Sequence, residues 1–355
     1  MPLHPQIPKV SVLMLTYNHE LFIAQAIESA LIQETNFTFE IVIGEDCSTD
    51  RTRKIVREFQ STHPDKIRLL PSDRNVGMHR NYFRTLQACV GEYVAVLEGD
   101  DFWTSRGKLQ KQADFLDTHG DYVICFHNVT VFRDDGSKPP WRLCPDDQKE
   151  TSTIEDLLIG NFIPTCATMF RNEQIGEIPE WLYSLNVLDW PLHILKAREG
   201  FVGYINKTMA AYRMHSSGAF SGFDPVRLQL SRLEMYESLL GRLSNRHDRL
   251  IRNSIFRTWY ALAVAYAKDN DAENALTYSR MCLWEKPFGS RLMTKLKVLL
   301  RWKTPRLFSF AQELKSLGRT AVERVRSLLS RNKPESIERR TGLENTSMWK
   351  ARRQA

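Results

Sequence analysis

The sequence lacks any uninterrupted apolar run of the roughly 18 residues that a membrane-spanning helix needs. Its first residues, MPLHPQIPKVSVLML, lack the basic start and long apolar stretch of a secretory signal peptide, so we expect none. The 6 cysteines form no C-x-x-C pair and no regular framework. Reduced thiols are the simplest interpretation. Together these absences favour a cytoplasmic protein.

Most of the chain has no excess of Lys and Arg over Asp and Glu, although the net charge of the whole chain is +7. Residues 286–355 hold 18 Lys and Arg against 5 Asp and Glu, a balance of +13 that leaves −6 for the rest. The basic pI of 9.0 therefore belongs to the tail and gives no support for nucleic-acid binding by the main domain. With 42% hydrophobic residues, the 355 residues can form one large core and a smaller second unit.

Apolar strands and amphipathic helices alternate over the first hundred or so residues. This alternation predicts an α/β fold, and the continuously apolar strands are typical of a parallel sheet that helices cover on both faces. After residue 101 the alternation loosens, and residues 134–140 form a clear break. The predicted strands are 9–16, 40–44, 67–70, 93–97, 122–132, 165–170 and 201–213, and the predicted helices are 20–33, 50–61, 78–89, 107–117 and 190–198.

Residues 226–285 have an almost wholly helical pattern. Part of it matches one tetratricopeptide-type helix pair, although Ala263 replaces the usual Gly and Ser279 replaces an aromatic residue. Because solenoids need about three repeats, we interpret the segment as a helical hairpin packed on the main domain, with a peptide-binding repeat as the alternative. The matching residues are Trp259, Leu262, Ala263, Tyr266, Ala275, Cys282 and Pro287.

The tail combines near-heptad apolar residues with many Lys and Arg. Such a stretch is compatible with peripheral contact with an anionic membrane surface, and equally with an ordinary helix that has a solvated charged face. From Asn332 onward it is polar and charged, and we expect disorder. The predicted parts are a main domain at 1–222, a helical extension at 223–290 and the tail at 291–355.

Two acidic clusters follow the second and fourth strands, Glu45-Asp46 and Glu98–Asp101. In open α/β sheets, ligands bind beyond the carboxyl ends of the strands. Three acidic groups in four residues are costly to bury without a cation, and Mg²⁺ or Mn²⁺ prefers oxygen ligands that phosphates complete. The second cluster therefore predicts a divalent cation and a phosphorylated ligand; the alternative is a solvated acidic turn.

Polar residues also follow the first strand, in Thr16-Tyr17-Asn18. Tyr17 is suited to stack on a base, while a neighbouring carboxylate can accept the imide N–H of a uracil-like base. The alternative is that Thr16 and Asn18 merely cap the helix that starts near Glu20.

The segment from Val10 to Trp103 resembles the donor-binding half of family-two glycosyltransferases with the GT-A fold. The matching residues are SVLMLTYN, EDCSTD at 45–50, RNVG at 74–77 and LEGDD at 97–101, and a weaker likeness continues to about residue 220. The resemblance implies a mostly parallel sheet flanked by helices and a nucleotide-sugar donor. The donor-binding residues that it implies are Thr16, Tyr17, Asn18, Glu20, Glu45, Asp46, Asn75, Gly77, Arg80, Glu98, Gly99 and Asp101.

The resemblance further implies a cation site and a catalytic base. Asp100 and His215 would bind Mn²⁺ or Mg²⁺, while Glu45 and Glu98 stand where the family usually has the shorter Asp. Asp189, in LDWPLHIL, matches the general base that an acceptor hydroxyl requires. The alternative for Asp189 is that it caps the helix that Pro191 begins. The alternative for His215 is that it is an ordinary loop histidine.

These features predict a metal-dependent inverting glycosyltransferase that uses a UDP-sugar or similar donor. The expected acceptor is a glycan or a lipid-linked precursor of a surface polysaccharide. One alternative is a sugar nucleotidyltransferase, but such an enzyme normally carries a Gly-rich loop with Lys or Arg after the first strand, where this chain has TYNHE. Another is a non-catalytic adaptor that uses the helical segment and the basic tail.

Overall fold

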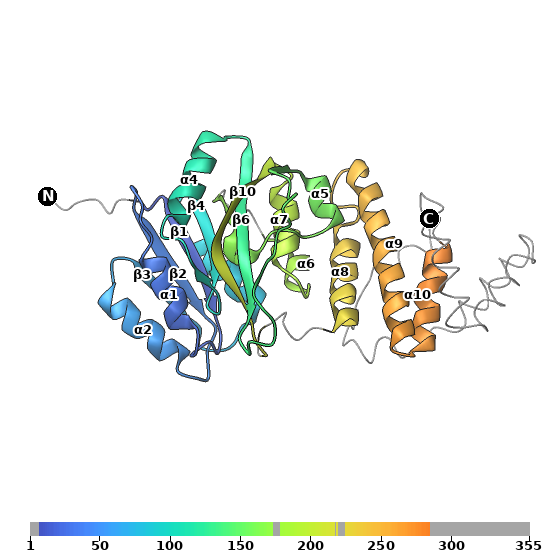
Figure 1. Ribbon diagram of the computed structural model, residues 1–355, viewed down its shortest axis with the longest axis horizontal. Helices are drawn as coiled ribbons and strands as arrows, with labels where there is room; N and C mark the ends of the chain where they lie inside the picture. Colours follow the sequence, from blue (N-terminus) through green and yellow to red (C-terminus); the bar gives the residue numbers. More distant parts are fainter. Residues whose placement is uncertain (1–6, 173–177, 217, 219–223, 285–355) are drawn as a thin grey trace, which may run out of the picture.

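A computed structural model describes residues 7–172, 178–216, 218 and 224–284. The described part is elongated, with an α/β half at one end and a group of helices at the other (Figure 1). The predictions for the tail at 291–355, and for Pro287, lie outside the described residues.

The first half of the sheet is parallel and has the order β3-β2-β1-β4. β1, β2 and β4 are almost wholly buried, whereas β3 is only partly buried, and the order of strands and helices confirms the predicted alternation to within a few residues. Because all four strands run in the same direction, the loops that follow them meet at one edge of the sheet. The elements are β1 (Val10–Thr16), α1 (Ile23–Leu31), β2 (Phe39–Glu45), α2 (Thr52–Thr62), β3 (Ile67–Pro71), α3 (Met78–Ala88) and β4 (Tyr93–Glu98).

The second half of the sheet is built on a long parallel pair, β6 (Tyr122–Arg133) and β10 (Phe201–Met214). A short antiparallel strand, β9 (Met169–Arg171), joins β4 to β6. Past the end of β4, β5 (Phe102–Trp103) pairs with β10 through Ala210 and Ala211. This pairing brings the last residues of β10 beside the acidic turn that follows β4.

Several short elements escaped prediction, and one predicted strand was partly wrong. Residues Thr165–Ala167 of the predicted strand 165–170 form a 3₁₀ turn after Pro164, and only the last part is β9. The carbonyl oxygen of Thr168 accepts the N–H of Val96 at 3.1 Å, which continues the antiparallel pairing of β9 with β4 by one residue, so the extended conformation begins only after the 3₁₀ turn. The unpredicted elements are β5, β7 (Trp141–Arg142), β8 (Thr151–Ser152), α5 (Ile154–Ile159) and α6 (Glu180–Tyr183).

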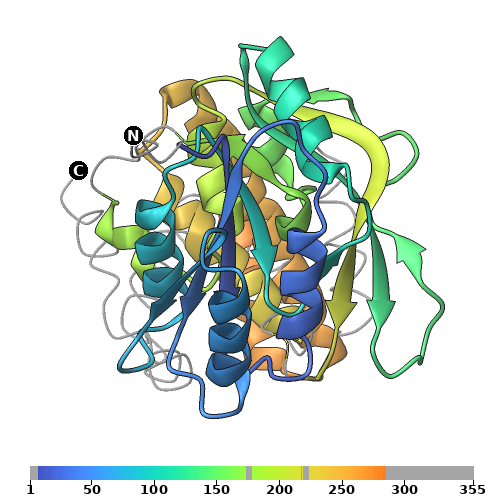
Figure 2. The same ribbon diagram turned by 90° about the vertical axis from the view of Figure 1, so that its left-hand side faces the viewer.

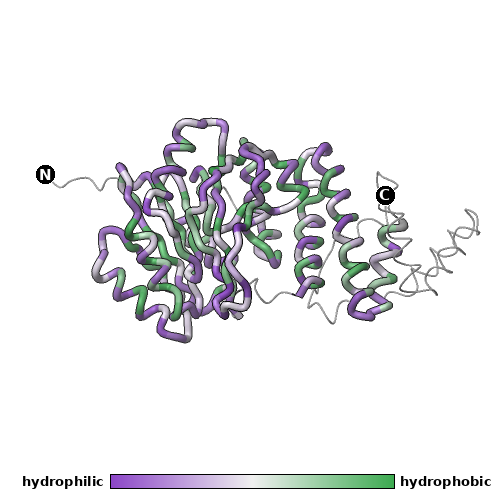
Figure 3. The backbone as a smooth tube through the Cα atoms, in the orientation of Figure 1, coloured by the Kyte–Doolittle hydropathy of each residue, from purple (hydrophilic) through white to green (hydrophobic). Residues whose placement is uncertain are grey.

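Two apolar layers enclose the sheet. On one face, Val12 and Met14 pack with α1, α2 and α4 (Lys108–Thr118), the first two of which lie in front of the sheet in Figure 2. On the other face, Leu13 packs with α3 and with the helices beyond it. The strands and the inner sides of the helices are accordingly the most hydrophobic parts of the backbone tube (Figure 3).

The helical end consists of α8 (Pro225–Leu239), α9 (Asn245–Lys268) and α10 (Ala272–Trp284), and it shares the second layer of core with the sheet. Tyr236 and Ser254 both donate to the carbonyl oxygen of Leu158 in α5, at 3.1 and 2.7 Å. These contacts join α8 and α9 to α5. Within the described residues, we find no helix that is both long and apolar enough to cross a membrane.

The ammonium group of Lys108 is buried in the core, and we expect its burial to lower the free energy of unfolding. Its Nζ has no hydrogen-bond partner within the described residues and lies 3.9 Å from the centroid of the Trp103 ring. Burial lowers the Lys108 pKa to about 7 from 10.5. Between these two values the unfolded chain binds the extra proton, so the free energy of unfolding rises with pH, by up to about 1.4 kcal/mol per pH unit.

We expect Lys108→Met to raise Tm at pH 7 and to remove this pH dependence. Replacing an isolated buried charge by an apolar chain should recover at least about 1 kcal/mol, or roughly 2–4 °C. Thermal unfolding between pH 6 and 10 measures the effect, and Lys111→Met, on the exposed side of the same helix, is the control. A lower Tm for Lys108→Met at pH 7 would show that the ammonium group stabilises the fold.

Candidate functional site

The ends of β1, β2, β4 and β10 bring most of the predicted site residues to one edge of the sheet. Asp46 donates its N–H to the carbonyl of Thr16 at 3.1 Å, and Gly99 donates its N–H to Leu15 at 2.8 Å. These bonds join the loops after the three parallel strands. A larger residue at Gly99 would force neighbouring side chains to shift, because a Cβ there would lie 2.9 Å from Thr16 Oγ1 and from His19 Nδ1.

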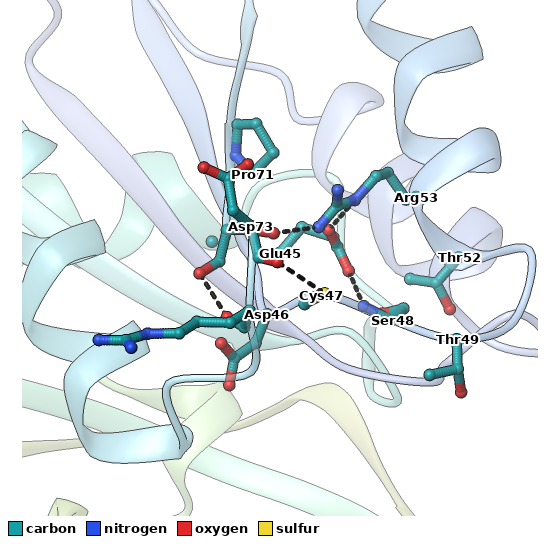
Figure 4. Close-up of polar contacts among 12 residues, drawn as sticks. Glu45, Asp46, Cys47, Ser48, Thr49, Thr52, Arg53, Pro71 and Asp73 are labelled. Carbon is teal, nitrogen blue, oxygen red and sulfur yellow. Dashed lines mark hydrogen bonds and ion pairs between the residues drawn. The ribbon is translucent and has the colours of Figure 1, made fainter.

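Glu45 and Asp46, predicted to face the donor, brace the surrounding loops. The buried carboxylate of Glu45 accepts from the backbone N–H of Ser48 at 2.5 Å and pairs with Arg53 Nε (Figure 4). Asp46 accepts the backbone N–H groups of Val76 and Gly77 at 2.8 and 2.9 Å. All four carboxylate oxygens are thus engaged within the protein, and contact between Glu45 and a base stays a prediction.

The loop after β1 is hydrogen-bonded to the loop after β2. Asn18, at a φ of 53°, accepts the N–H of Thr49 at 2.8 Å, and Glu20 accepts the N–H of Arg51 at 3.0 Å. The capping alternative for Thr16 and Asn18 is wrong, because α1 begins only at Ile23, without a side-chain cap. Tyr17 remains 42% exposed, so its ring is available for stacking.

The loop before α3 has the predicted turn. Gly77, with a φ of 85°, is the N-cap residue of α3, and the side chain of Asn75 accepts its N–H at 3.0 Å. Arg80, one turn into the helix, is exposed and lies 5.4 Å from the centroid of the Tyr183 ring. The loop therefore presents backbone and a basic side chain near the end of β2.

Asp100 lies between two histidines. Its Oδ2 is 3.1 Å from His215 Nε2 and 3.8 Å from His19 Nε2. Burial opposes ionisation, but the hydrogen bond from His215 and the charges of both histidines hold the Asp100 pKa below its usual value. Burial also lowers the His19 pKa. His19 was not predicted from the sequence as a site residue. Its position in the loop after the first strand, two residues after Tyr17, could have indicated it.

Two further carboxylates of the acidic turn are buried beside Asp100. Glu98 Oε2 has no hydrogen-bond partner within the described ranges, whereas Asp101 Oδ1 accepts the N–H of Arg213 at 2.8 Å. Burial and then the charge of Asp101 raise the Glu98 pKa, and burial and then the charge of Asp100 raise the Asp101 pKa. The turn is therefore not the solvated acidic loop that the alternative interpretation required.

This arrangement fits a divalent cation only if another molecule supplies part of its ligand shell. In the part of the chain that the structure describes, no group of three or more His, Cys, Asp or Glu side chains is arranged to hold a metal ion. Asp100 and His215 offer one oxygen and one nitrogen ligand, and phosphate and water oxygens are the usual complement for Mg²⁺ or Mn²⁺. A cation there would also favour the ionised form of Glu98, whose Oε2 has no hydrogen-bond partner in the described part of the chain.

Asp189 lies on the first turn of α7 (Asp189–Lys196), but it does not cap that helix. Its Oδ2 instead accepts from Asn161 Nδ2 at 3.1 Å and Thr165 Oγ1 at 3.3 Å, while Oδ1 has no hydrogen-bond partner among the described residues. The capping alternative for Asp189 is therefore wrong. A carboxylate held by one oxygen leaves the other to accept a proton.

Two histidines near Asp189 are held neutral by burial. Burial lowers the His193 pKa to about 4 despite the charge of Asp189, and burial also lowers the His79 pKa. His79 Nε2 and His193 Nδ1 have no hydrogen-bond partner within the described ranges. At neutral pH neither imidazole can therefore form an ion pair with Asp189.

Comparisons with known proteins agree with this geometry. The model of the family described as glycosyl transferase family 2 matches residues 11–175. The Mycobacterium tuberculosis protein Rv1520 is 35% identical over 210 residues, which are 59% of this chain and 60% of that protein. TuaG of Bacillus subtilis, named for teichuronic acid biosynthesis, is 30% identical over 214 residues, which cover 58% of this chain and 79% of TuaG.

Solved structures share the fold at low sequence identity. A structure of Staphylococcus aureus TarS with UDP-GlcNAc matches 84% of this chain and 82% of its own, with a TM-score of 0.57 and 17% identity. The mannosyltransferase PcManGT of Pyrobaculum calidifontis, solved with GDP-Man and Mn²⁺, matches 84% of this chain and 86% of its own, with a TM-score of 0.54 and 18% identity. These likenesses establish the GT-A fold.

Proposed function

Since the chain belongs to glycosyltransferase family 2, we propose that it transfers a sugar from a nucleoside-diphosphate sugar to an acceptor hydroxyl. The observation that carries the proposal is the arrangement at the sheet edge. Asp100 and His215 form an acid–imidazole pair suited to a cation and a diphosphate, and Asp189 supplies a carboxylate with one oxygen that accepts no hydrogen bond from the described residues. Because TarS was solved with UDP-GlcNAc and TuaG is named for teichuronic acid biosynthesis, we favour a UDP-sugar and a surface polysaccharide acceptor.

On the donor side, the exposed ring of Tyr17 stacks on the base, and the loops braced by Glu45 and Asp46 surround the nucleoside. Asp100 and His215 would hold Mn²⁺ or Mg²⁺. A divalent cation at this position would offset the charge that develops on the departing diphosphate. PcManGT was solved with Mn²⁺, which makes Mn²⁺ the first metal to test.

On the acceptor side, Asp189 Oδ1 accepts the proton of the acceptor hydroxyl while the hydroxyl oxygen attacks the anomeric carbon of the donor sugar. The bond between the anomeric carbon and the diphosphate oxygen breaks, and its electron pair leaves with the nucleoside diphosphate. One base and one leaving group on opposite sides of the sugar imply a single displacement. We therefore propose inversion of configuration.

The proposal is tested by isothermal titration of the purified full-length protein with UDP, GDP and dTDP, with Mn²⁺ and with EDTA. We expect metal-dependent binding of at least one nucleotide, with UDP first. The absence of binding by all three would overturn the proposal. A screen of nucleotide sugars for slow donor hydrolysis then identifies the sugar.

The two residues that donate hydrogen bonds to Asp189, Asn161 and Thr165, can be tested separately from the general base itself. Thr165→Val combined with Asn161→Ala removes both hydrogen bonds to Asp189 Oδ2 and leaves Oδ1 in place. Because an oriented base loses much of its advantage when displaced by about 1 Å, we expect kcat to fall by about 10- to 100-fold. The KM for the donor should change less than about twofold, since neither side chain lies on the donor side. Unchanged kcat would show that other contacts orient Asp189.

A further inference from the structure

Arg213, the second-last residue of β10, is the most heavily engaged side chain beside the acidic turn. Its guanidinium donates to the carbonyl oxygen of Asp100 at 3.0 Å, to Asp134 Oδ1 at 2.7 Å and to Gln25 Oε1 at 2.6 Å. Its own backbone N–H donates to Asp101 Oδ1 at 2.8 Å. One residue thus joins the acidic turn to α1 and to the loop after β6.

Aromatic rings surround the same guanidinium. Its central carbon lies 4.7 Å from the centroid of Phe22, 4.9 Å from that of Phe132 and 5.6 Å from that of Phe102. Phe22 also contacts the ring of His215, with 4.6 Å between centroids. His215 lies one residue past the end of β10, and Phe22 contacts both it and Arg213.

These contacts form a closed ring around Asp100. Arg213 holds its main-chain carbonyl, His215 Nε2 lies 3.1 Å from its carboxylate, and Phe22 packs against both partners. The direction of the Asp100 carboxylate is therefore fixed from two ends. A lysine could not replace the arginine in this role, because a single ammonium lacks the planar fork that reaches three acceptors and stacks on rings.

We propose that Arg213 is a positioning residue for the phosphate end of the donor site, acting by fixing the direction in which Asp100 and His215 face. This inference rests on the proposed function. The competing interpretation is that Arg213 only stabilises the fold. The two differ in what happens to metal-dependent nucleotide binding when the arginine is replaced and the protein still folds.

The chain offers a matched control in Arg171 on β9. Its guanidinium donates to the carbonyls of Tyr122 and Leu116, at 2.9 and 2.7 Å, and lies 5.6 Å from the ring centroid of Tyr93. Arg171 pairs with the first residue of β4, so it lies at the opposite end of the strand from the acidic turn. Arg171→Lys therefore removes a comparable set of guanidinium contacts at a position away from the acidic turn.

The experiment titrates full-length wild type, Arg213→Lys and Arg171→Lys with UDP, or with whichever nucleotide the wild type binds, at saturating Mn²⁺ and in EDTA. We expect Arg213→Lys to raise the Kd in Mn²⁺ at least tenfold and to leave the Kd in EDTA unchanged. Arg171→Lys should change neither, while both variants lower Tm to a similar extent. In a transfer assay, Arg213→Lys should raise the Mn²⁺ concentration that gives half-maximal rate more than it lowers kcat.

Equal nucleotide binding by Arg213→Lys and Arg171→Lys would overturn the inference and leave the proposed function intact. If the wild type binds no nucleotide, both proposals fall together. Should Arg213→Lys fail to fold, Phe22→Leu takes its place, because it removes the ring between Arg213 and His215 and keeps the arginine. A Kd in Mn²⁺ raised at least threefold by Phe22→Leu supports the inference, and an unchanged Kd overturns it.

Discussion

Asp189→Asn is expected to lower kcat for sugar transfer by about 10²- to 10⁴-fold, the usual contribution of a placed general base. Asparagine keeps the size of the side chain and still accepts hydrogen bonds from Asn161 and Thr165 through its amide oxygen, but it cannot remove the proton of the acceptor hydroxyl. Binding of nucleotide in Mn²⁺ should therefore match the wild type. Single-turnover transfer and isothermal titration measure the two effects on the same preparation.

A matched control for Asp189→Asn is Asp248→Asn. Asp248 is also an aspartate on the first turn of a helix, and it accepts the backbone N–H of Gly241 at 2.9 Å, but it lies in α9. The control removes the same charge from a helix N-terminus and should leave kcat unchanged. If Asp189→Asn retained full transfer, Asp189 would not be the base, and the anchoring by Asn161 and Thr165 would be purely structural.

Asp100→Asn is expected to abolish the stimulation of nucleotide binding by Mn²⁺ and to lower transfer by more than about 100-fold. The substitution removes the negative charge that faces His215 and His19, and an amide is a far weaker ligand for a hard divalent cation than a carboxylate. Titration of UDP at increasing Mn²⁺ measures the effect. The wild type should show a curve that depends on Mn²⁺, and the variant should match the wild type in EDTA.

Asp117→Asn serves as the control for Asp100→Asn. Asp117 also forms an ion pair, with Lys9 Nζ at 2.9 Å, but it lies near the first residues of β1 and β4, away from the acidic turn. If Asp100→Asn kept Mn²⁺-dependent binding, the cation would be held elsewhere. If the wild type in EDTA transferred sugar at the full rate, the proposed metal dependence would be wrong.

The parallel half of the fold could be predicted because β1, β2 and β4 are continuously apolar and end in polar residues. The two-residue strands could not, since β5 is a strand only by virtue of its partners Ala210 and Ala211 in β10. The same limit applies to contacts. Nothing in the sequence around Asp189 indicates that Asn161 and Thr165 hold it, because they lie 28 and 24 residues earlier, on a different loop.

Site residues were predictable by position more than by role. Glu45 and Asp46 do lie at the end of β2, but no sequence pattern indicates that their oxygens accept from Ser48, Arg53 and the loop before α3. Hydrogen bonds to a main-chain N–H leave no signature in the identity of the donor residue. The sequence therefore indicates where a carboxylate lies, and only the structure shows which of its oxygens remain available to a ligand.

The core shared by the sheet and the helical end has a practical consequence. The ring of Tyr236 in α8 lies 5.6 Å from that of Trp190 in α7, and Trp259 in α9 belongs to the same buried cluster. A fragment shortened to residues 1–222 would expose this apolar surface to water and would be prone to aggregate. Engineered versions should therefore extend through residue 284, and a calorimeter should record the melting of both ends as one event.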